Sequence, residues 1–274
     1  MSRAWHSLYL PFDDARAAAD ALVGALTACG YERYDPFPGG TGLAPAWKQR
    51  VRHFVAPSRS GWVRILGEPE PAALPLLAAA LGVPLLHAWL VDDESGLTVW
   101  TAAGRDDSPA AFAAWLRDGC TPDVFQRALA GQGPAPAAPK AADSLGVPLP
   151  DDVQVLADSV DMDQAGQMMA RLTRSLFGRL GDRADAMQEE ARAMLSGEPI
   201  WETAAGRRLR AAVACLRVPE DWQQPDEGDL RAAYQVARSR KHNPRGLRLP
   251  GDDAALARVP DALAYLPVYA GRRG

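Results

Sequence analysis

Residues 50–66 read RVRHFVAPSRSGWVRIL and carry the clearest strand pattern in the chain. Two sets of side chains alternate along its first part: Val51, His53 and Val55 in one set, and Arg50, Arg52 and Phe54 in the other. Successive side chains of a strand point to opposite faces, so this alternation predicts a strand with two different faces. Turn-forming residues at 57–61 then lead into a second short apolar run at 62–66. The stretch predicts a β-hairpin.

Helices and strands alternate on both sides of this hairpin. The expected elements are, in order, a strand at 8–12, a helix from Asp13-Asp14 to about Cys29, the hairpin, a helix at 71–81, strands at 85–91 and 97–101, and short helices at 109–117 and 122–130. Acidic residues cap helix starts and glycines end helices, so Gly30 and Gly82 mark two of the boundaries. The order β-α-β-β-α-β with an extra strand is the ferredoxin-like pattern.

The second half of the chain is dominated by helical spacing. Residues 131–150, GQGPAPAAPKAADSLGVPLP, predict an extended linker because proline, alanine and glycine dominate them. Beyond the linker, apolar side chains recur every three or four residues, as in 165–180 and 201–216. We therefore expect an α+β protein with a ferredoxin-like domain at 1–130, the linker, and an all-α domain at 151–274. A four- or five-helix bundle, with an apolar tail that docks back, is the simplest arrangement.

Composition limits the class of protein further. The 274 residues are enough to bury a core, and the net charge of −4 excludes a globally basic nucleic-acid binder while leaving room for a local basic patch. Abundant alanine and a strong preference for arginine over lysine are typical of a GC-rich bacterial genome. Cys29, Cys120 and Cys215 form no CxxC pair and fit a reducing compartment. Neither a signal peptide nor a membrane-spanning run is evident, so we expect a soluble cytoplasmic protein.

Known catalytic and metal-binding patterns do not occur. The four histidines show neither HxxxH nor HExxH spacing: His6, His53, His87 and His242. Asp161-Met162-Asp163 has the DxD spacing of some metal-dependent transferases, but it precedes an amphipathic helix and is better explained as a helix cap. The GGTG loop at 39–42 lacks the phosphate-loop and dinucleotide-loop patterns. We predict no catalytic residue, metal site or cofactor. The missing motifs favour a protein that is not an enzyme, while catalysis without a known motif stays open.

Aromatic and arginine side chains gather on one face of the expected sheet. Eight apolar side chains are expected to face the two helices: Leu8, Leu10, Val51, Val55, Val63, Ile65, Leu86 and Leu90. The opposite face would then carry Trp5, Tyr9, Arg52, Phe54, Trp62, Arg64, His87 and Trp89. The ferredoxin-like strand order makes the first and third strands central, so Trp5, Tyr9, Trp62 and Arg64 should lie close together. This face either recognises a partner or ligand by stacking and cation–π contacts, or is covered by the helical half, the extra strand or a second subunit.

A second candidate surface is a basic run near residue 240. Its members are Arg231, Arg238, Arg240, Lys241, His242, Arg245 and Arg248, with no acidic residue from 231 to 250. Arginine pairs with phosphate oxygens in two places, so these cations are candidate phosphate or nucleic-acid contacts. The competing interpretation is a solvated helix end whose cations pair with acids elsewhere in this half.

Three functions follow from these features. The preferred hypothesis is a non-enzymatic interaction or adaptor protein, a bacterial cytoplasmic component of a larger assembly, with other protein subunits or a second copy as partners. The first alternative is nucleic-acid binding through the basic run, with or without the aromatic face. The second is a small-ligand sensor or unrecognised enzyme that uses the sheet face, the glycine loop, His53 and His87. No membrane partner is expected.

Overall fold

The structure is a computed structural model of the whole chain, described here for residues 4–35, 47–132, 200–246, 248 and 251–273. The chain divides into two compact units, one of which comprises Ser2–Pro134 together with Thr203–Gly274. The other unit contains Ala135–Glu202, of which only the turn η1 (Ile200–Glu202) is described. Most of the predicted linker and bundle, the GGTG loop and Asp161–Asp163 lie outside the described residues, so the predicted division of the chain stays a prediction.

The described residues of the first unit form a mixed α+β fold built on a single antiparallel sheet of eight strands, in the order β2-β8-β3-β4-β1-β5-β6-β7. The strands are β1 (Ala4–Leu10), β2 (Glu32–Arg33), β3 (Gln49–Val55), β4 (Val63–Leu66), β5 (Leu85–Val91), β6 (Glu94–Thr101), β7 (Gly104–Asp106) and β8 (Leu266–Arg272). The helices are α1 (Ala15–Ala28), α2 (Ala73–Leu81), α3 (Pro109–Ala113), α4 (Pro122–Leu129), α8 (Ala204–Val213), α9 (Glu227–His242) and α10 (Asp252–Arg258), with a further turn η2 (Ala262–Ala264).

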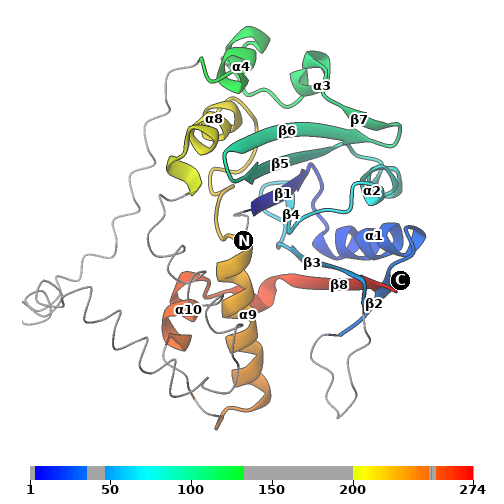
Figure 1. Cartoon of the computed structure of the whole chain (residues 1–274), viewed down its shortest axis with the longest axis vertical. Coiled ribbons are helices and arrows are strands. Elements are labelled where there is room, and N and C mark those ends of the chain that lie inside the picture. The colour runs from blue at the N-terminus through cyan, green and yellow to red at the C-terminus, as the bar shows by residue number, and fades with distance from the viewer. Residues whose placement is uncertain (1–3, 36–46, 133–199, 247, 249–250, 274) are drawn as a thin grey trace, which may run out of the picture. The chain divides into compact units, whose positions relative to one another are not determined.

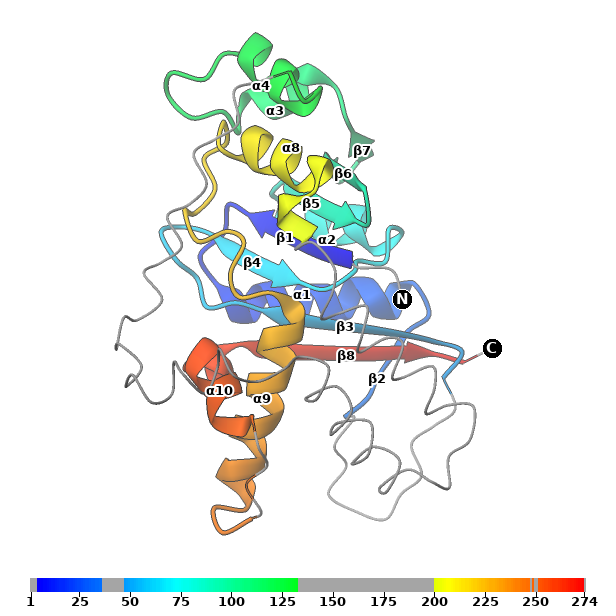
Figure 2. The same cartoon turned by 60° about the vertical axis from the view of Figure 1, so that its left-hand side comes forward.

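Helices cover both faces of the sheet (Figures 1 and 2). On one face α1 and α2 pack on a core that includes Leu8, Ile65 and Leu85. On the other face lie α8, α9 and α10, and Phe54 packs there with Leu230 of α9 and Ala262 of η2. A sheet covered on both faces buries apolar side chains on both. The site described below lies on the α9 face.

Local sequence signals fixed the first helices and the hairpin as expected. Asp14 caps α1, its carboxylate accepting from the backbone N–H groups of Arg16 and Ala17 at 2.9 Å. Gly82 ends α2 with a left-handed φ of 66°, a conformation that only glycine adopts without strain. β3 and β4 pair antiparallel, and β1 lies beside β4. The expected hairpin and the flanking helices are confirmed.

The C-terminal tail differs from the prediction. Residues 151–274 were expected to be all helical, whereas Leu266–Arg272 forms β8 and pairs with β3 along the whole of that strand. β2 pairs only with Ala270 and Gly271, so the edge of β8 stays open at Pro267, where a proline is tolerated. With β2, β7 and β8 added, the sheet has more strands than the ferredoxin-like pattern predicted. Both halves of the sequence therefore contribute to one sheet.

The predicted register of β5 is wrong by one residue. Leu86 pairs with Tyr9 and was expected on the α1 face, but it shares the opposite face with Tyr9. His87 instead pairs with Leu8, which packs under α1 and α2. The error arises because β5 buries leucines on both faces, and alternation then no longer distinguishes one face from the other.

Candidate functional site

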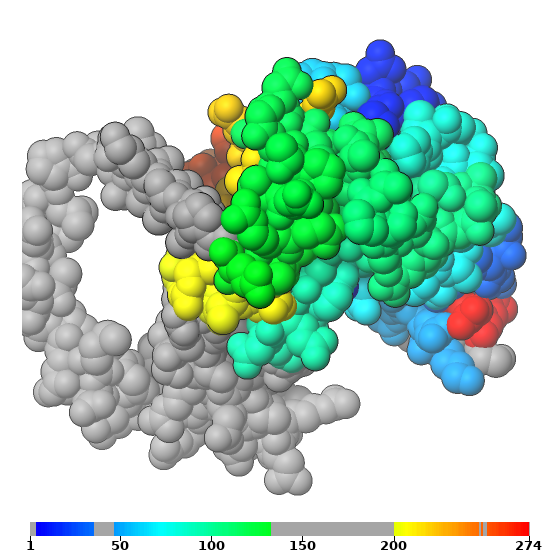
Figure 3. Space-filling view, turned by 90° about the horizontal axis from the view of Figure 1, so that it is seen from above, coloured from blue at the N-terminus to red at the C-terminus, as the bar shows by residue number. Residues whose placement is uncertain are grey.

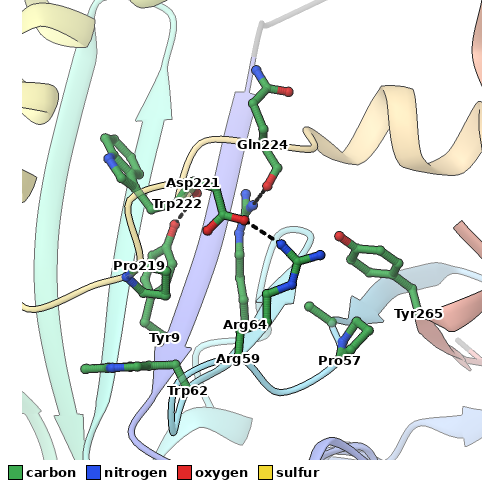
Figure 4. A pocket seen from close by; sticks show the side chains of 11 residues that line it. Tyr9, Pro57, Arg59, Trp62, Arg64, Pro219, Asp221, Trp222, Gln224 and Tyr265 are labelled. Atoms are coloured by element: carbon green, nitrogen blue, oxygen red, sulfur yellow. Dashed lines mark hydrogen bonds and ion pairs between the residues drawn. The ribbon is translucent and has the colours of Figure 1, made fainter. Parts of the chain in front are cut away.

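A small cavity lies on the α9 face of the sheet, between the β3–β4 hairpin and the chain that connects α8 to α9. The space open to a water-sized molecule is about 40 Å³, which suits roughly three waters or one small polar group. The residues that line it come from both halves of the chain (Figure 4): Tyr9, Ala56, Pro57, Arg59, Trp62, Arg64, Pro219, Asp221, Trp222, Gln224 and Tyr265.

Arg64 is the most deeply buried charge that lines this cavity. Its side chain leaves β4 opposite Tyr9 and is only 8% exposed. Nε donates to the Ser7 hydroxyl at 2.7 Å, and Nη1 donates to the Gln224 carbonyl oxygen at 2.7 Å. The guanidinium also lies over two aromatic rings, 5.8 Å from the ring centre of Trp5 and 5.9 Å from that of Tyr9. These contacts fix the plane and position of the guanidinium.

The charge of Arg64 is incompletely compensated. Its Nη2 is buried and has no hydrogen-bond partner, and within the described residues no carboxylate lies within ion-pair distance of the guanidinium. Each cation–π contact contributes about 0.5–2 kcal/mol. Burying an ion costs several kcal/mol unless an opposite charge compensates it. The cavity therefore contains a fixed positive charge with a donor left over.

Ion-paired side chains form the mouth of the cavity. The Arg59 guanidinium contacts the Asp221 carboxylate at 2.8 Å and the Asp261 carboxylate at 3.5 Å, and all three side chains are largely exposed. Figure 4 shows Arg59 and Asp221 facing each other beside Trp62 and Tyr265. An exposed pair of this kind is held weakly, so an incoming anion can compete with Asp221 for Arg59.

Two tyrosines add hydroxyl groups to the cavity wall. Tyr9 is 1% exposed and donates its hydroxyl to the Trp222 carbonyl oxygen at 2.6 Å. Tyr265 is also buried, and its hydroxyl has no hydrogen-bond partner among the described residues. Burial raises the pKa of the Tyr9 and Tyr265 hydroxyls, with Arg64 acting in the opposite direction on both. Both hydroxyls therefore stay protonated, and that of Tyr265 can donate to a bound anion.

The structure brings together part of the predicted aromatic face. Trp5, Tyr9, Phe54 and Arg64 share one face and are buried there, and Trp62 is half-buried at the cavity wall. The cover comes from the chain's own C-terminal residues: Trp222 packs edge-on against Trp5 at 5.5 Å, and Tyr234 against Phe54 at 5.4 Å.

The remaining predicted face residues lie elsewhere. Arg52 is half-buried and lines a separate surface cleft together with Glu68 and Glu227. His87 and Trp89 are on the α1 and α2 face, because the register of β5 was misassigned. There His87 Nε2 lies 3.2 Å from His6 Nδ1, and burial lowers the pKa of His87 to about 3. In the described part of the chain, no group of three or more His, Cys, Asp or Glu side chains lies close enough together to hold a metal ion.

Several cavity residues were not found from the sequence. Arg59 lies in the predicted hairpin tip, while Asp221, Trp222 and Gln224 lie in a connection that has no regular pattern. Gln224 takes part through its backbone oxygen, and any residue type could supply that atom. A lone tryptophan in the polar stretch 219–229 was the one available signal, because a large aromatic side chain in a loop tends to pack on a neighbouring core.

The predicted basic run divides into paired and unpaired cations. Arg238 pairs with Asp35 at 3.1 Å, and Arg240 pairs with Asp253 at 2.8 Å. Four exposed cations have no carboxylate within ion-pair distance in the described part of the chain: Arg231, Lys241, Arg245 and Arg248. Lys241 lies in the last turn of α9, Arg245 and Arg248 follow the end of that helix, and Arg231 lies near its start.

Comparison with protein-family models, curated proteins and solved structures finds no match to this chain. Among the described helices, none is long and apolar enough to cross a membrane.

Proposed function

We propose that this chain is a non-enzymatic binding protein whose cavity at Arg64 holds the anionic head of a small ligand. The observation that carries the proposal is the buried Nη2 of Arg64, which among the described residues has neither a hydrogen-bond partner nor a carboxylate within ion-pair distance. Hydrogen bonds from an ionised donor are about twice as strong as neutral ones, so a buried guanidinium with a spare N–H is a strong anion receptor.

The donor set favours a carboxylate or phosphate oxygen. Nη2 of Arg64 and the Tyr265 hydroxyl are the unused donors, and Arg59 stands at the mouth. The space of about 40 Å³ admits the charged head alone. The rest of a ligand must then lie outside, across the half-buried rings of Trp62 and Trp222. A ligand with one carboxylate on a flat apolar ring fits a site of this kind, with the carboxylate in the cavity and the ring against the two tryptophans.

Benzoate is the direct probe, with benzamide as its neutral counterpart and phosphate as the second anion. At ten times its Kd, benzoate should stabilise the protein by about 1.4 kcal/mol and raise Tm by about 3–5 °C. Benzamide should leave Tm unchanged at the same ionic strength. A larger shift with phosphate than with benzoate would assign the site to phosphate esters. The absence of a shift with both anions would contradict the proposal.

Substitutions at the cavity then locate the binding. Arg64→Met keeps an unbranched apolar stem but removes the charge and donors, and we expect it to weaken benzoate binding by at least about 10-fold. Tyr265→Phe should weaken it by about 2–10-fold. Arg258→Met removes an exposed arginine that pairs with Asp229 instead, and it should bind benzoate like the wild type. Equal Kd values for Arg64→Met and Arg258→Met would place the anion elsewhere.

Nucleic-acid binding remains a second candidate, favoured by the unpaired cations Lys241, Arg245 and Arg248. If they contact phosphates, replacing all three with alanine should reduce the slope of log K against log salt by about 2–3. Arg16→Ala removes an exposed arginine of α1 and should leave that slope unchanged. Flat titrations of the wild type with single- and double-stranded probes at low salt would exclude this function.

Two broader expectations stay predictions. A role as an interaction or adaptor protein in a bacterial assembly is tested by light scattering and by pull-down from the source organism. A ferredoxin-like origin of the sheet is supported by the order β3-β4-β1-β5 with α1 and α2 on one face. In that arrangement the additional strands β8, β6 and β7 extend the two sides of a four-stranded unit.

A further inference from the structure

Two distant segments meet beside α8, well away from the Arg64 cavity. Leu116 and Leu216 form an antiparallel bridge. On either side of it, the Arg117 N–H donates to the Cys215 carbonyl oxygen at 2.9 Å, and the Arg217 N–H donates to the Trp115 carbonyl oxygen at 2.7 Å. Helices α4 and α8 pack beside this bridge, and Figure 3 shows them side by side at the surface. The two segments are therefore held in a fixed register.

That register brings two cysteines together. The Cys120 N–H donates to the Arg117 carbonyl oxygen at 3.1 Å, which turns Cys120 back toward the bridge. The Cys120 thiol lies near enough to Cys215 to interact with it electrostatically. Each thiol at present donates to a nearby carbonyl oxygen at 3.8 Å, Cys120 to that of Thr121 and Cys215 to that of Ala211. Both are free thiols, Cys120 half-buried and Cys215 only 9% exposed. A disulfide needs its sulfurs about 2.05 Å apart, so both side chains must rotate away from these carbonyl oxygens to form the bond.

We propose that Cys120 and Cys215 form a reversible disulfide when the protein meets a peroxide. Cys120 is the more accessible thiol and reacts first: its sulfur attacks the peroxide O–O bond, giving a sulfenic acid and water. Cys215 sulfur then attacks the sulfenic sulfur, the S–S bond forms, and a second water leaves. In total two thiols and one hydrogen peroxide give one disulfide and two waters, each cysteine sulfur losing one electron. A dithiol restores the reduced pair.

The order of the two steps agrees with the electrostatics of the pair. Burial is the main reason that the pKa of the Cys215 thiol is raised, to about 12, and the neighbouring Cys120 adds to the shift. A thiol that resists ionisation is a poor first nucleophile toward peroxide. It can act in the second step, because the sulfenic acid then forms at the neighbouring residue and the proton of the Cys215 thiol leaves with the departing hydroxide as water.

Peptide mapping of the full-length protein tests the link directly. The protein is treated with hydrogen peroxide, alkylated in denaturant with N-ethylmaleimide, and digested with trypsin without reduction. Trypsin places Cys120 in the peptide 118–127 and Cys215 in the peptide 211–217. We expect these two peptides joined, at a mass two hydrogens below their sum, and separated again by dithiothreitol. Two alkylated thiols after peroxide treatment, or Cys120 carried only to sulfinic acid, would overturn the proposal.

Thermal unfolding gives a second readout. The closed loop spans about 95 residues, and a crosslink of that length should raise Tm by about 5 °C or more in the oxidised protein. Cys29→Ser removes the remaining cysteine, which follows α1, and should retain both the linked peptide and the Tm increase. Cys215→Ser should lose both, and its Cys120 should trap a sulfenic-acid reagent. A Tm increase that persists in Cys215→Ser would also contradict the disulfide.

Discussion

Replacing Phe54 by alanine should lower the free energy of unfolding by about 3–5 kcal/mol, because the ring is removed from a fully packed interior. Phe54 is 0% exposed and lies on the α9 face of β3. Its ring centre is 5.4 Å from that of Tyr234 in α9 and 6.1 Å from that of Tyr269 in β8. Urea denaturation followed by tryptophan fluorescence and by circular dichroism measures the change.

The same experiment tests whether the C-terminal helices and the sheet unfold together. If they share one core, both probes should report one transition, and Phe54→Ala should shift it as a whole. Leu263→Ala is the matched control, since Leu263 belongs to η2 on the same face but is 43% exposed. Its effect should stay within about 0.5 kcal/mol. A loss below about 1 kcal/mol for Phe54→Ala would mean that α9 does not cover this face.

Elements that depend on neighbouring residues were predictable from the sequence. Asp14, Gly30 and Gly82 act through their own backbone or through groups two or three residues away, so local inspection was enough to place the ends of α1 and α2. The alternation at 50–55 likewise predicted β3 because its two faces differ in character. These signals require no knowledge of the rest of the chain.

Pairing between distant segments was not predictable in the same way. β8 lies beside β3 although about 210 residues separate them, and nothing in LPVYAGR specifies that neighbour. With Pro267 and Gly271 among its seven residues, β8 also has a weak strand signal. The register of β5 failed for a related reason, since Leu85 and Leu86 are both buried, one on each face. Where both faces of a strand are apolar, only the pairing with its neighbouring strand determines which side chains point to which face of the sheet.

The candidate site follows the same rule. Tyr9, Trp62 and Arg64 were predicted to meet because alternation and strand order place them on one sheet face, and the structure brings them together at one cavity. The cavity wall formed by the connection at 219–224 was not predictable, because it depends on a backbone oxygen and on the fold of an irregular segment. The spare donor of Arg64 emerges only when those partners are counted atom by atom.

Buried histidines should make the protein sensitive to acid. His53 is 0% exposed on the α1 face of β3, and neither ring nitrogen has a well-aligned hydrogen-bond partner. Burial lowers its pKa from 6.5 to about 4, and the nearby Leu66 backbone offsets only part of that shift. Because the folded protein holds this ring neutral, the unfolded chain takes up the proton first as the pH falls. Stability is therefore complete above pH 6.5 and is lost progressively toward pH 4, by about 3 kcal/mol from this residue.

Urea unfolding at intervals from pH 7 to pH 4 isolates this contribution when His53→Leu is compared with the wild type. The carboxylates are common to both proteins, so the difference between the two curves reports the histidine. We expect the stability of His53→Leu to fall by about 3 kcal/mol less than that of the wild type between pH 6.5 and pH 4. His242→Leu, at the exposed end of α9, should follow the wild-type curve. Parallel curves for His53→Leu and the wild type would show that the ring of His53 is protonated as easily in the folded protein as in water. His87, on the same sheet face, has its pKa lowered to about 3. Its own acid sensitivity is common to the wild type and to His53→Leu, so it cancels in the difference between their curves.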